Sequence, residues 1–473
     1  MIASGAAGAV VLALGMWAAA PTATAGVGHA SEARAVSKSP QNTFTLVAGS
    51  HVFPGTPATA QVDNPRYVAW TTHTGTSFGA DYVTMGQSSG TPSTTHTALS
   101  GLGSISDHIT VLPQGSVTQV PLLVYTGTSC IQGALGPTTP WAVQTWSLSN
   151  DCFNPVPSAA VNAAGTVGAS WPGSGVRYRI GTSPTIPATG PDATIPVASP
   201  VFKTGMAVDS TSQDFYVGWA REFAGSHDGF YAEDVTAGGT VMKMPGTGTS
   251  SINHQPPIGR MAMSAVNGSG VYLAACSNTA TCHLKVWKVG SSTTHTVPGA
   301  NSPFIAAIAP AATGGLWVAW GDQQNNTVKV TRSNQAVTQW EPVTTLHTAC
   351  AEHESVSIVG PNASPADIAL ECVANKTLQE AVYVAHVLPR MTVAVSPSKV
   401  ANTSAHTVTV KVTDAGLGVP AADVTLRGTT KSTNSVGSVT FKVPKGVSPA
   451  KYTVVVTKSP FFQKATDTLT VTH

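Results

Sequence analysis

Short apolar strands that end in tryptophan, or in a residue that replaces it, recur along the chain at a nearly regular spacing. Seven such strands can be aligned, and successive ends lie 45 to 56 residues apart. They read RYVAW, PLLVY, VGASW, FYVGW, VYLAA, LWVAW and DIALE, and they end at Trp70, Tyr125, Trp171, Trp219, Ala275, Trp320 and Glu371. A period of this length indicates a repeat architecture in which each unit is one small sheet.

Each of these strands has two recognisable neighbours. A strand of small apolar residues precedes it, as in FIAAIAP at residues 304–310, and a strand with alternating apolar and polar residues follows, as in VKVTR. Small residues suit a crowded inner strand, whereas alternation suits a half-exposed outer strand. This order is typical of a propeller blade. We therefore predict an all-β fold in which residues 43–389 form a seven-bladed β-propeller, with the recurrent tryptophans packed between sheets.

The ends of the repeat region predict how the ring closes. The seventh unit reaches Pro389 without an outermost strand, and the segment TFTLVAG at residues 43–49 is a spare strand ahead of the first unit. We expect residues 43–49 to complete the last blade, which removes the open edges of the sheet. The alternative is a string of β-sandwiches.

The pattern changes at residue 390. Residues 390–473 contain six or seven longer, evenly alternating strands with turn residues between them, which predicts an immunoglobulin-like β-sandwich. This segment resembles bacterial immunoglobulin-like and carboxypeptidase-regulatory-like domains, and the matching positions are Asp414, Gly418, Pro420, Gly437 and Tyr452. The resemblance implies a spacer or adhesive module, in which we expect Tyr452 to pack in the core.

The beginning of the chain is typical of an exported protein. Residues 5–20 form an apolar block, and Ala23-Thr24-Ala25 follows it as a cleavage site, so residues 1–25 are predicted to be a signal peptide. Residues 26–42 would be a flexible linker. A membrane anchor is the alternative, although the block is short for a bilayer span. We expect a secreted protein, either released or associated with the cell surface, with no membrane span in the mature chain.

Six cysteines in an exported chain favour disulfides over a metal site, because no CxxC pattern is present. Pairing of sequence neighbours gives the expected bridges, which are Cys130–Cys152, Cys276–Cys282 and Cys350–Cys372.

Charge is scarce. Charged residues make up 10% of the chain and the formal net charge is +2, whereas soluble domains carry roughly 25% charged residues. No basic cluster suited to nucleic acid occurs. The few carboxylates also leave little choice for the acid and base pair that glycoside hydrolysis needs.

The sixth repeat carries a resemblance to a known family. The segment LWVAWGDQQNNTVKVTRSNQAVTQW at residues 316–340 is similar to the bacterial-neuraminidase type of propeller repeat, found in sialidases and in non-enzymatic relatives. The chain lacks the S-x-D-x-G-x-T-W box of that family. Its three-arginine carboxylate clamp also has no counterpart, because Arg177 and Arg179 fall on a predicted outer strand of the third unit, where a solvated strand face is expected.

Loops between the second and third strands of propeller blades share one face, and here they carry the candidate binding residues. These are His73, Arg221, Glu222, His227, Asp228, Asp322 and Gln323. Glu222, Asp228 and Asp322 are also the candidate catalytic carboxylates. The segment GDQQNN is either a tight turn or a weak calcium loop, since it offers only one carboxylate. We expect no cofactor otherwise.

These features favour a monomeric, secreted, non-enzymatic recognition or adhesion protein that binds extracellular carbohydrate or protein. One alternative is a divergent propeller glycoside hydrolase or lyase of sialidase type, which requires two carboxylates to converge near the axis of the ring. The other is an inert envelope or matrix protein.

Overall fold

The structure is a computed structural model of the 473-residue chain. It describes residues 43–473 apart from the segments 49–52, 55–56, 62–64, 75, 87–88, 103–108, 115–119, 128–129, 137–141, 146–156, 183–191, 198–200, 222–227, 248–260, 277–282, 302, 304, 312–313, 323–324, 361–364 and 375–379. The described residues contain strands and no α-helix, so the all-β prediction is confirmed. None of their segments is a helix long and apolar enough to cross a membrane.

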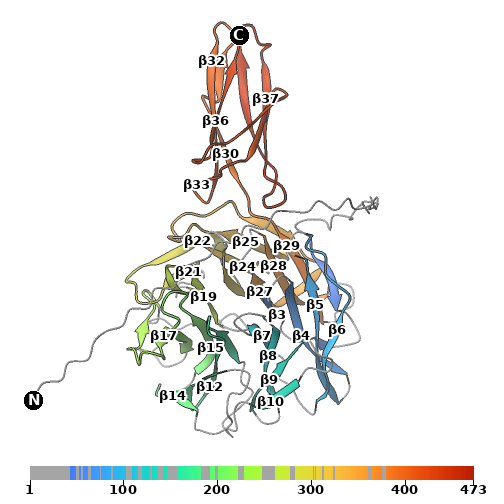
Figure 1. The fold of residues 1–473 in the computed structure, drawn as a ribbon, viewed down its shortest axis with the longest axis vertical. Helices are drawn as coiled ribbons and strands as arrows, with labels where there is room; N and C mark the ends of the chain where they lie inside the picture. Colours follow the sequence, from blue (N-terminus) through green and yellow to red (C-terminus); the bar gives the residue numbers. More distant parts are fainter. Residues whose placement is uncertain are drawn as a thin grey trace, which may run out of the picture. The chain divides into compact units, whose positions relative to one another are not determined.

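The strands between residues 45 and 387 form seven antiparallel sheets, numbered here in chain order (Figure 1). Sheet 1 contains β2 (Phe53–Pro54), β3 (Ala58–Gln61), β4 (Arg66–Thr74), β5 (Ser77–Met85) and β6 (His96–Leu102). Sheet 2 contains β7 (Ile109–Gln114), β8 (Val120–Gly127), β9 (Cys130–Leu135) and β10 (Ala142–Thr145). Sheet 3 contains β11 (Ser158–Val161), β12 (Thr166–Gly173), β13 (Gly175–Thr182) and β14 (Ala193–Ile195). Sheet 4 contains β15 (Val201–Val208), β16 (Phe215–Arg221), β17 (Gly229–Asp234) and β18 (Met242–Lys243).

The remaining three sheets of this region follow the same order. Sheet 5 contains β19 (Ala262–Val266), β20 (Gly270–Cys276), β21 (His283–Lys288) and β22 (Thr294–Asn301). Sheet 6 contains β23 (Ala306–Pro310), β24 (Leu316–Asp322), β25 (Thr327–Arg332) and β26 (Thr344–His347). Sheet 7 contains β27 (Cys350–Val359), β28 (Ala366–Ala374), β29 (Glu380–Val387) and β1 (Thr45–Ala48), which pairs antiparallel with β29. The first segment of the region and its last strand thus share one sheet.

The inner strands of the seven sheets contact one another in a cycle. Along the chain β3, β7, β11, β15, β19, β23 and β27 each contact the next, and β27 also contacts β3. Seven apolar clusters follow the same cycle, because each joins side chains from two neighbouring sheets. Trp70, Trp171, Trp219 and Trp320 are all buried in these clusters. The expectation that these tryptophans pack between sheets is confirmed.

The junction between sheet 7 and sheet 1 contains a buried ion pair as well as an apolar cluster. Trp70 packs there with Val384 and Ala369. Nη1 of Arg66 lies 2.6 Å from Oδ2 of Asp367, and both side chains are fully buried. Oδ1 of Asp367 lies 2.6 Å from Nδ1 of His386. Removing one partner of such a pair leaves an uncompensated buried charge, which typically costs about 3–5 kcal/mol. Losing either residue would therefore destabilise this junction, which joins residues 301 positions apart in sequence.

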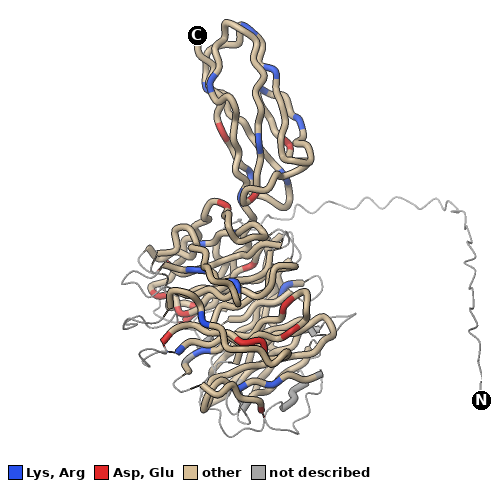
Figure 2. Tube along the Cα trace, turned by 90° about the vertical axis from the view of Figure 1, so that its left-hand side faces the viewer, with Lys and Arg blue, Asp and Glu red and all other residues tan. Residues whose placement is uncertain are grey.

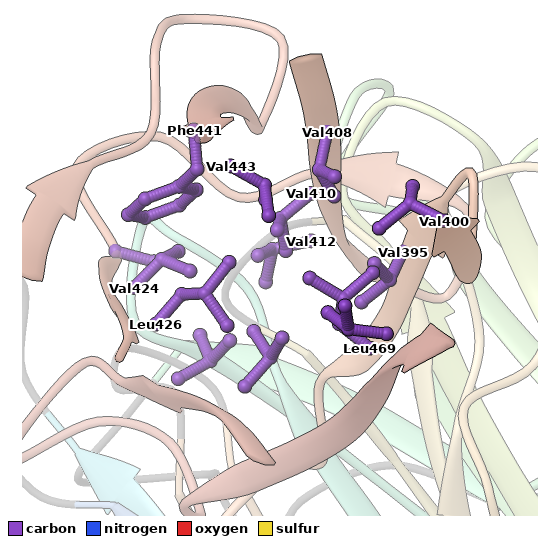
Figure 3. Packing of buried hydrophobic residues seen from close by; sticks show 14 of the residues in the cluster. Val395, Val400, Val408, Val410, Val412, Val424, Leu426, Phe441, Val443 and Leu469 are labelled. Carbon is purple, nitrogen blue, oxygen red and sulfur yellow. The ribbon is translucent and has the colours of Figure 1, made fainter. Parts of the chain in front are cut away.

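Residues 392–472 form two further sheets. One contains β30 (Thr392–Ser396), β32 (His406–Asp414), β33 (Leu417–Gly418) and β36 (Ser438–Val443). The other contains β31 (Lys399–Ala401), β38 (Ala465–Thr472), β37 (Ala450–Thr457), β34 (Asp423–Leu426) and β35 (Thr429–Ser432), with β31 parallel to β38. Alternate residues of both sheets point into one valine-rich core, where Val395 of β30 lies beside Leu469 of β38 (Figure 3).

Tyr452 and Gly437, two of the positions on which the resemblance to bacterial immunoglobulin-like domains was based, have clear structural roles. The Tyr452 side chain packs against the valine-rich core, and its hydroxyl donates a hydrogen bond of 2.8 Å to the carbonyl of Ser448. Gly437 has a φ of 75°, and a side chain there would collide with the carbonyl of Val412. Tyr452 is partly exposed and packs against the edge of the core, so the expectation of a core tyrosine is met only in part. Glycine is required at position 437.

Sheet 6 contacts residues 390–473 through a buried polar group. The Arg332 guanidinium pairs with the Asp414 carboxylate, and its carbon atom lies 5.2 Å from the centroid of the Trp317 ring. Glu341 is buried beside this pair and accepts a hydrogen bond of 2.7 Å from the backbone N–H of Arg390. Burial raises the pKa of Glu341 to about 8, and the Asp414 carboxylate adds to this effect while Arg332 opposes it.

This raised pKa predicts that stability falls as the pH rises. Between pH 4.5 and about 8, Glu341 is protonated in the folded protein and ionised in the unfolded chain. The folded state therefore binds the extra proton, and the free energy of unfolding should drop through this window by roughly 3–5 kcal/mol. Glu341→Gln should remove that drop, measured by urea denaturation at several pH values. Asp423→Asn, at an exposed position in β34, is the control, and an unchanged pH dependence in Glu341→Gln would contradict the account.

Candidate functional site

The hairpins that join second to third strands carry the candidate residues, and they lie at the same end of each sheet as the start of the inner strand. In sheet 6, for example, Ala306 at the start of β23 pairs with Trp320 near the end of β24. The described candidates at these hairpins are His73 in sheet 1, Arg221 and Asp228 in sheet 4, and Asp322 in sheet 6. Glu222, His227 and Gln323 lie outside the described residues.

The two described candidate residues of sheet 4 are buried, whereas residues that bind a ligand at the surface should be exposed. Arg221 is 8% exposed and Asp228 is 5% exposed. Arg221 ends β16 and faces Gly229 across the hairpin, so strand pairing continues up to the loop. These two side chains support the hairpin from inside, and a ligand at the surface would not reach them without a rearrangement.

His73 forms part of an aromatic pair in sheet 1. It faces Phe78 across the β4–β5 hairpin, and the two rings stack with their centroids 4.5 Å apart. Both side chains are partly exposed. An exposed, rigid aromatic face of this kind can pack against an apolar ligand face.

Asp322 is the centre of a polar cluster at the end of sheet 6. Nζ of Lys329 lies 2.6 Å from Oδ2 of Asp322, and Nδ2 of Asn325 donates to the same oxygen at 2.9 Å. Burial raises the pKa of Asp322, but the hydrogen bonds from Lys329 and Asn325 outweigh it, so the net pKa is lowered. The carboxylate is therefore ionised at neutral pH, and the cluster offers charged groups of both signs at a partly exposed hairpin.

His353 lies beside this cluster, at the start of the neighbouring inner strand. Its Nε2 is 2.9 Å from the hydroxyl of Thr348. Its ring packs against Gly321, because a side-chain carbon at that position would lie 3.3 Å from Nδ1. Burial lowers the pKa of His353, and the Asp322 carboxylate partly offsets this. The imidazole is therefore neutral at pH 7. Sequence reasoning missed His353 because it lies 31 residues beyond Asp322 in an ordinary alternating strand.

A disulfide lies next to His353. Cys350 is bonded to Cys372, as predicted, and His353 faces Cys372 across the strand pair. Cys276 is also disulfide-bonded. Cys152 and Cys282 lie outside the described residues, so the pairings Cys130–Cys152 and Cys276–Cys282 stay predictions. The Cys350–Cys372 bond anchors the start of the strand that presents His353.

A central cavity of about 180 Å³ lies among the inner strands of the seven sheets. Its polar lining consists of hydroxyl residues, and its apolar lining consists of methionine, aliphatic and proline residues. Ser355 lines it and donates a hydrogen bond of 2.8 Å to the buried carboxylate of Glu371. The candidate carboxylates Asp228 and Asp322 belong to sheets 4 and 6, with sheet 5 between them in the ring order.

Arg179, predicted on a solvated strand face, instead forms a largely buried ion pair. It pairs with Asp192 at 3.1 Å, and its side chain is only 10% exposed, so the prediction is wrong for this residue.

Within the described residues, no three His, Cys, Asp or Glu side chains gather as a metal ion would need. Charged residues are sparse and interspersed among uncharged ones (Figure 2).

No known protein family matches the chain, and no curated protein is similar to it. Among solved structures, it is similar to the polysaccharide lyase Uly1 at 10% identity and a TM-score of 0.42, over 72% of this chain and 91% of that chain. The similarity to the SapL1 lectin in complex with alpha methyl fucoside has 10% identity and a TM-score of 0.38, over 59% and 92% of the two chains. A prolyl endopeptidase structure matches at 10% identity and a TM-score of 0.40, over 78% of this chain and 56% of that one. These TM-scores are too low to assign a fold or a site, so both are inferred from the strand pairing and side-chain contacts of this chain alone.

The coupling between Asp322 and His353 can be tested by titration. Replacing Asp322 by Asn removes the negative charge that raises the pKa of His353, so this pKa should fall further below 6.5. Nuclear magnetic resonance titration of the His353 imidazole measures the shift directly. Asp214→Asn, in sheet 4, serves as the control. A His353 pKa that stays constant or rises in Asp322→Asn would show that the two groups do not interact.

Proposed function

We propose that this chain is an exported, non-enzymatic recognition protein that binds an extracellular carbohydrate or protein. Residues 1–25 act as the signal peptide and residues 26–42 as a linker. Residues 43–389 form a seven-bladed β-propeller whose last blade is completed by the strand at residues 43–49. Residues 390–473 form an immunoglobulin-like module that holds or extends the propeller.

Several observations support this architecture. The inner strands contact one another in a cycle, and β1 joins the sheet of β27, β28 and β29. Propellers are built from such four-stranded sheets around a central channel. In the C-terminal region, the Tyr452 hydroxyl bonds back to the carbonyl four residues upstream, as a tyrosine corner does in immunoglobulin-like domains.

The polar cluster at Asp322 carries the functional proposal. Asp322, Asn325 and Lys329 come from one hairpin, and their hydrogen-bonding groups are held in place by one another. Such a preorganised set of donors and acceptors loses little conformational entropy when it binds a polar ligand. His73 and Phe78 add an aromatic surface at the corresponding hairpin of sheet 1. Hydroxyl groups and an apolar face are what a sugar presents to a protein.

An array of glycans and extracellular-matrix proteins, probed with the mature chain, tests this proposal. We expect specific binding to at least one ligand, and Asp322→Asn should weaken it roughly ten- to a hundredfold, since hydrogen bonds to charged groups contribute roughly 1.5–3 kcal/mol. Asp209→Asn is the matched control, because Asp209 lies in the turn after β15, at the opposite end of sheet 4.

Two results would contradict the proposal. One is the absence of binding to every member of the array. The other is turnover of a glycoside or polysaccharide substrate that Glu222→Ala abolishes, which would favour the hydrolase or lyase alternative.

A further inference from the structure

The sheet of β30, β32, β33 and β36 has an open edge at β36. This strand pairs with β32 and with no other strand of the described residues. The far side of β36 therefore carries backbone N–H and C=O groups that no strand of this chain satisfies. Such an edge is a template for pairing with another polypeptide. The way this edge is protected decides whether the chain associates with other copies.

The strand register shows which backbone groups of β36 face outward. Val412 of β32 lies opposite Gly437, and its N–H donates to the Gly437 carbonyl at 2.8 Å, so the two form a hydrogen-bonded pair. Bonded and non-bonded pairs alternate along an antiparallel ladder, and β36 begins directly after Gly437. The outward groups therefore belong to Ser438, Thr440 and Lys442.

Two residues outside β36 already bond to these groups. Oδ1 of Asn434 accepts a hydrogen bond of 2.9 Å from the N–H of Ser438, and the N–H of Asn434 donates to the Ser438 carbonyl at 2.9 Å. Nζ of Lys431 donates to the Thr440 carbonyl at 2.9 Å and also lies 5.3 Å from the centroid of the Phe441 ring. Thr440 is the middle of the edge, so a second strand cannot pair there while Lys431 holds its carbonyl.

A second strand has room to approach this edge. An open groove separates β36 from β35, the edge strand of the opposite sheet, and the side chains of Thr440 and Lys442 are exposed. The groove is lined by Lys431, Ser432, Asn434, Ser438, Val439 and Thr440. The Lys431 side chain crosses it from β35 to β36. Strand addition is therefore limited by the hydrogen bonds of Lys431 and Asn434 and not by lack of space.

The opposite edge of the same sheet has a comparable arrangement. Within the described residues β30 pairs with β32 alone. The N–H of Val395 in β30 donates a hydrogen bond of 3.0 Å to Oδ2 of Asp467, which belongs to β38 of the other sheet. Pro397 follows β30 and has no N–H to offer. Both edges of the sheet are thus capped by a charged side chain from the other sheet, which is a common means of blocking edge-to-edge pairing.

A second copy of β36 fits the uncapped edge in antiparallel direction. Copies related by a two-fold axis present the same groups to each other, so Thr440 would face Thr440 of the second copy, and Ser438 would face Lys442. No like charges meet directly in this register. The two Lys431 side chains, however, would both lie beside the central threonine pair, and their repulsion adds to the effect of the hydrogen bonds.

We propose that Lys431 and Asn434 keep the chain monomeric by capping the outer edge of β36, which otherwise pairs with β36 of a second copy. The interaction surface consists of the outward backbone groups of Ser438, Thr440 and Lys442. It lies in the C-terminal region and does not involve the hairpin around Asp322, so the inference does not depend on the proposed function.

Sedimentation equilibrium of the mature chain tests the proposal, at concentrations up to about 200 μM, which detect dissociation constants of that order. The parent chain should be monomeric. Lys431→Ala should form dimers with a dissociation constant at least about tenfold lower, because the variant no longer gives up a hydrogen bond from a charged donor when it dimerises. Adding Asn434→Ala should strengthen the association further.

Two variants serve as controls. Lys431→Arg keeps a charged donor at the same position and should remain monomeric. Lys442→Ala removes the same charge from β36 itself without freeing a backbone group, and it should also remain monomeric. Hydrogen exchange locates the interface, since the outward amides of Thr440 and Lys442 should exchange more slowly in the Lys431→Ala dimer than in the parent chain.

The proposal is overturned if the parent chain dimerises, or if Lys431→Ala stays monomeric over the whole range while its melting temperature shows that it is folded. It is also overturned if Lys442→Ala dimerises as strongly as Lys431→Ala, because net charge would then be the cause, or if the amides of Thr440 and Lys442 stay unprotected in the dimer. Asp322→Asn should leave the association unchanged, so failure here is distinguishable from failure of the proposed function.

Discussion

The junction between the first and last sheets is the constraint on which the rest of the structure depends. Every other apolar cluster of the ring joins sheets that follow one another along the chain, whereas this one joins residues about 300 positions apart. The chain must lose much conformational entropy before this contact forms. Burial of Trp70 and its apolar neighbours offsets that loss, and the Arg66–Asp367 pair requires both of its residues to be present.

The scarcity of charge has a consistent meaning in this framework. Two buried ion pairs lie where distant parts of the chain meet, Arg66 with Asp367 and Arg332 with Asp414. Hydroxyl side chains provide the polarity of the central cavity, where they avoid the desolvation penalty of an ion. The partly exposed Asp322–Lys329 pair is local to one hairpin, and it is the centre of the proposed binding surface.

Local sequence patterns predicted much of the fold but little of the site. The recurring strands around Trp70, Trp171, Trp219 and Trp320 were recognisable because each repeat buries one large side chain at the same position. Contacts between repeats leave no such signal. Asp367 and His386 looked like ordinary strand residues, and His353 gave no sign that it would lie beside Asp322. Arg221 and Asp228 were predicted in a ligand-binding loop, but both side chains are buried where the β16–β17 hairpin begins and ends.

Thermal unfolding of two truncated chains tests the closed ring most directly. One chain starts at residue 43 and keeps β1, and the other starts at residue 50 and lacks it. If β1 completes sheet 7, the second chain should melt a few degrees lower. A protein of this size loses roughly 1 °C of melting temperature for each kcal/mol of stability, and removal of β1 removes several backbone hydrogen bonds together with the packing of Phe44 and Val47. Equal melting temperatures for the two chains would contradict closure by this strand.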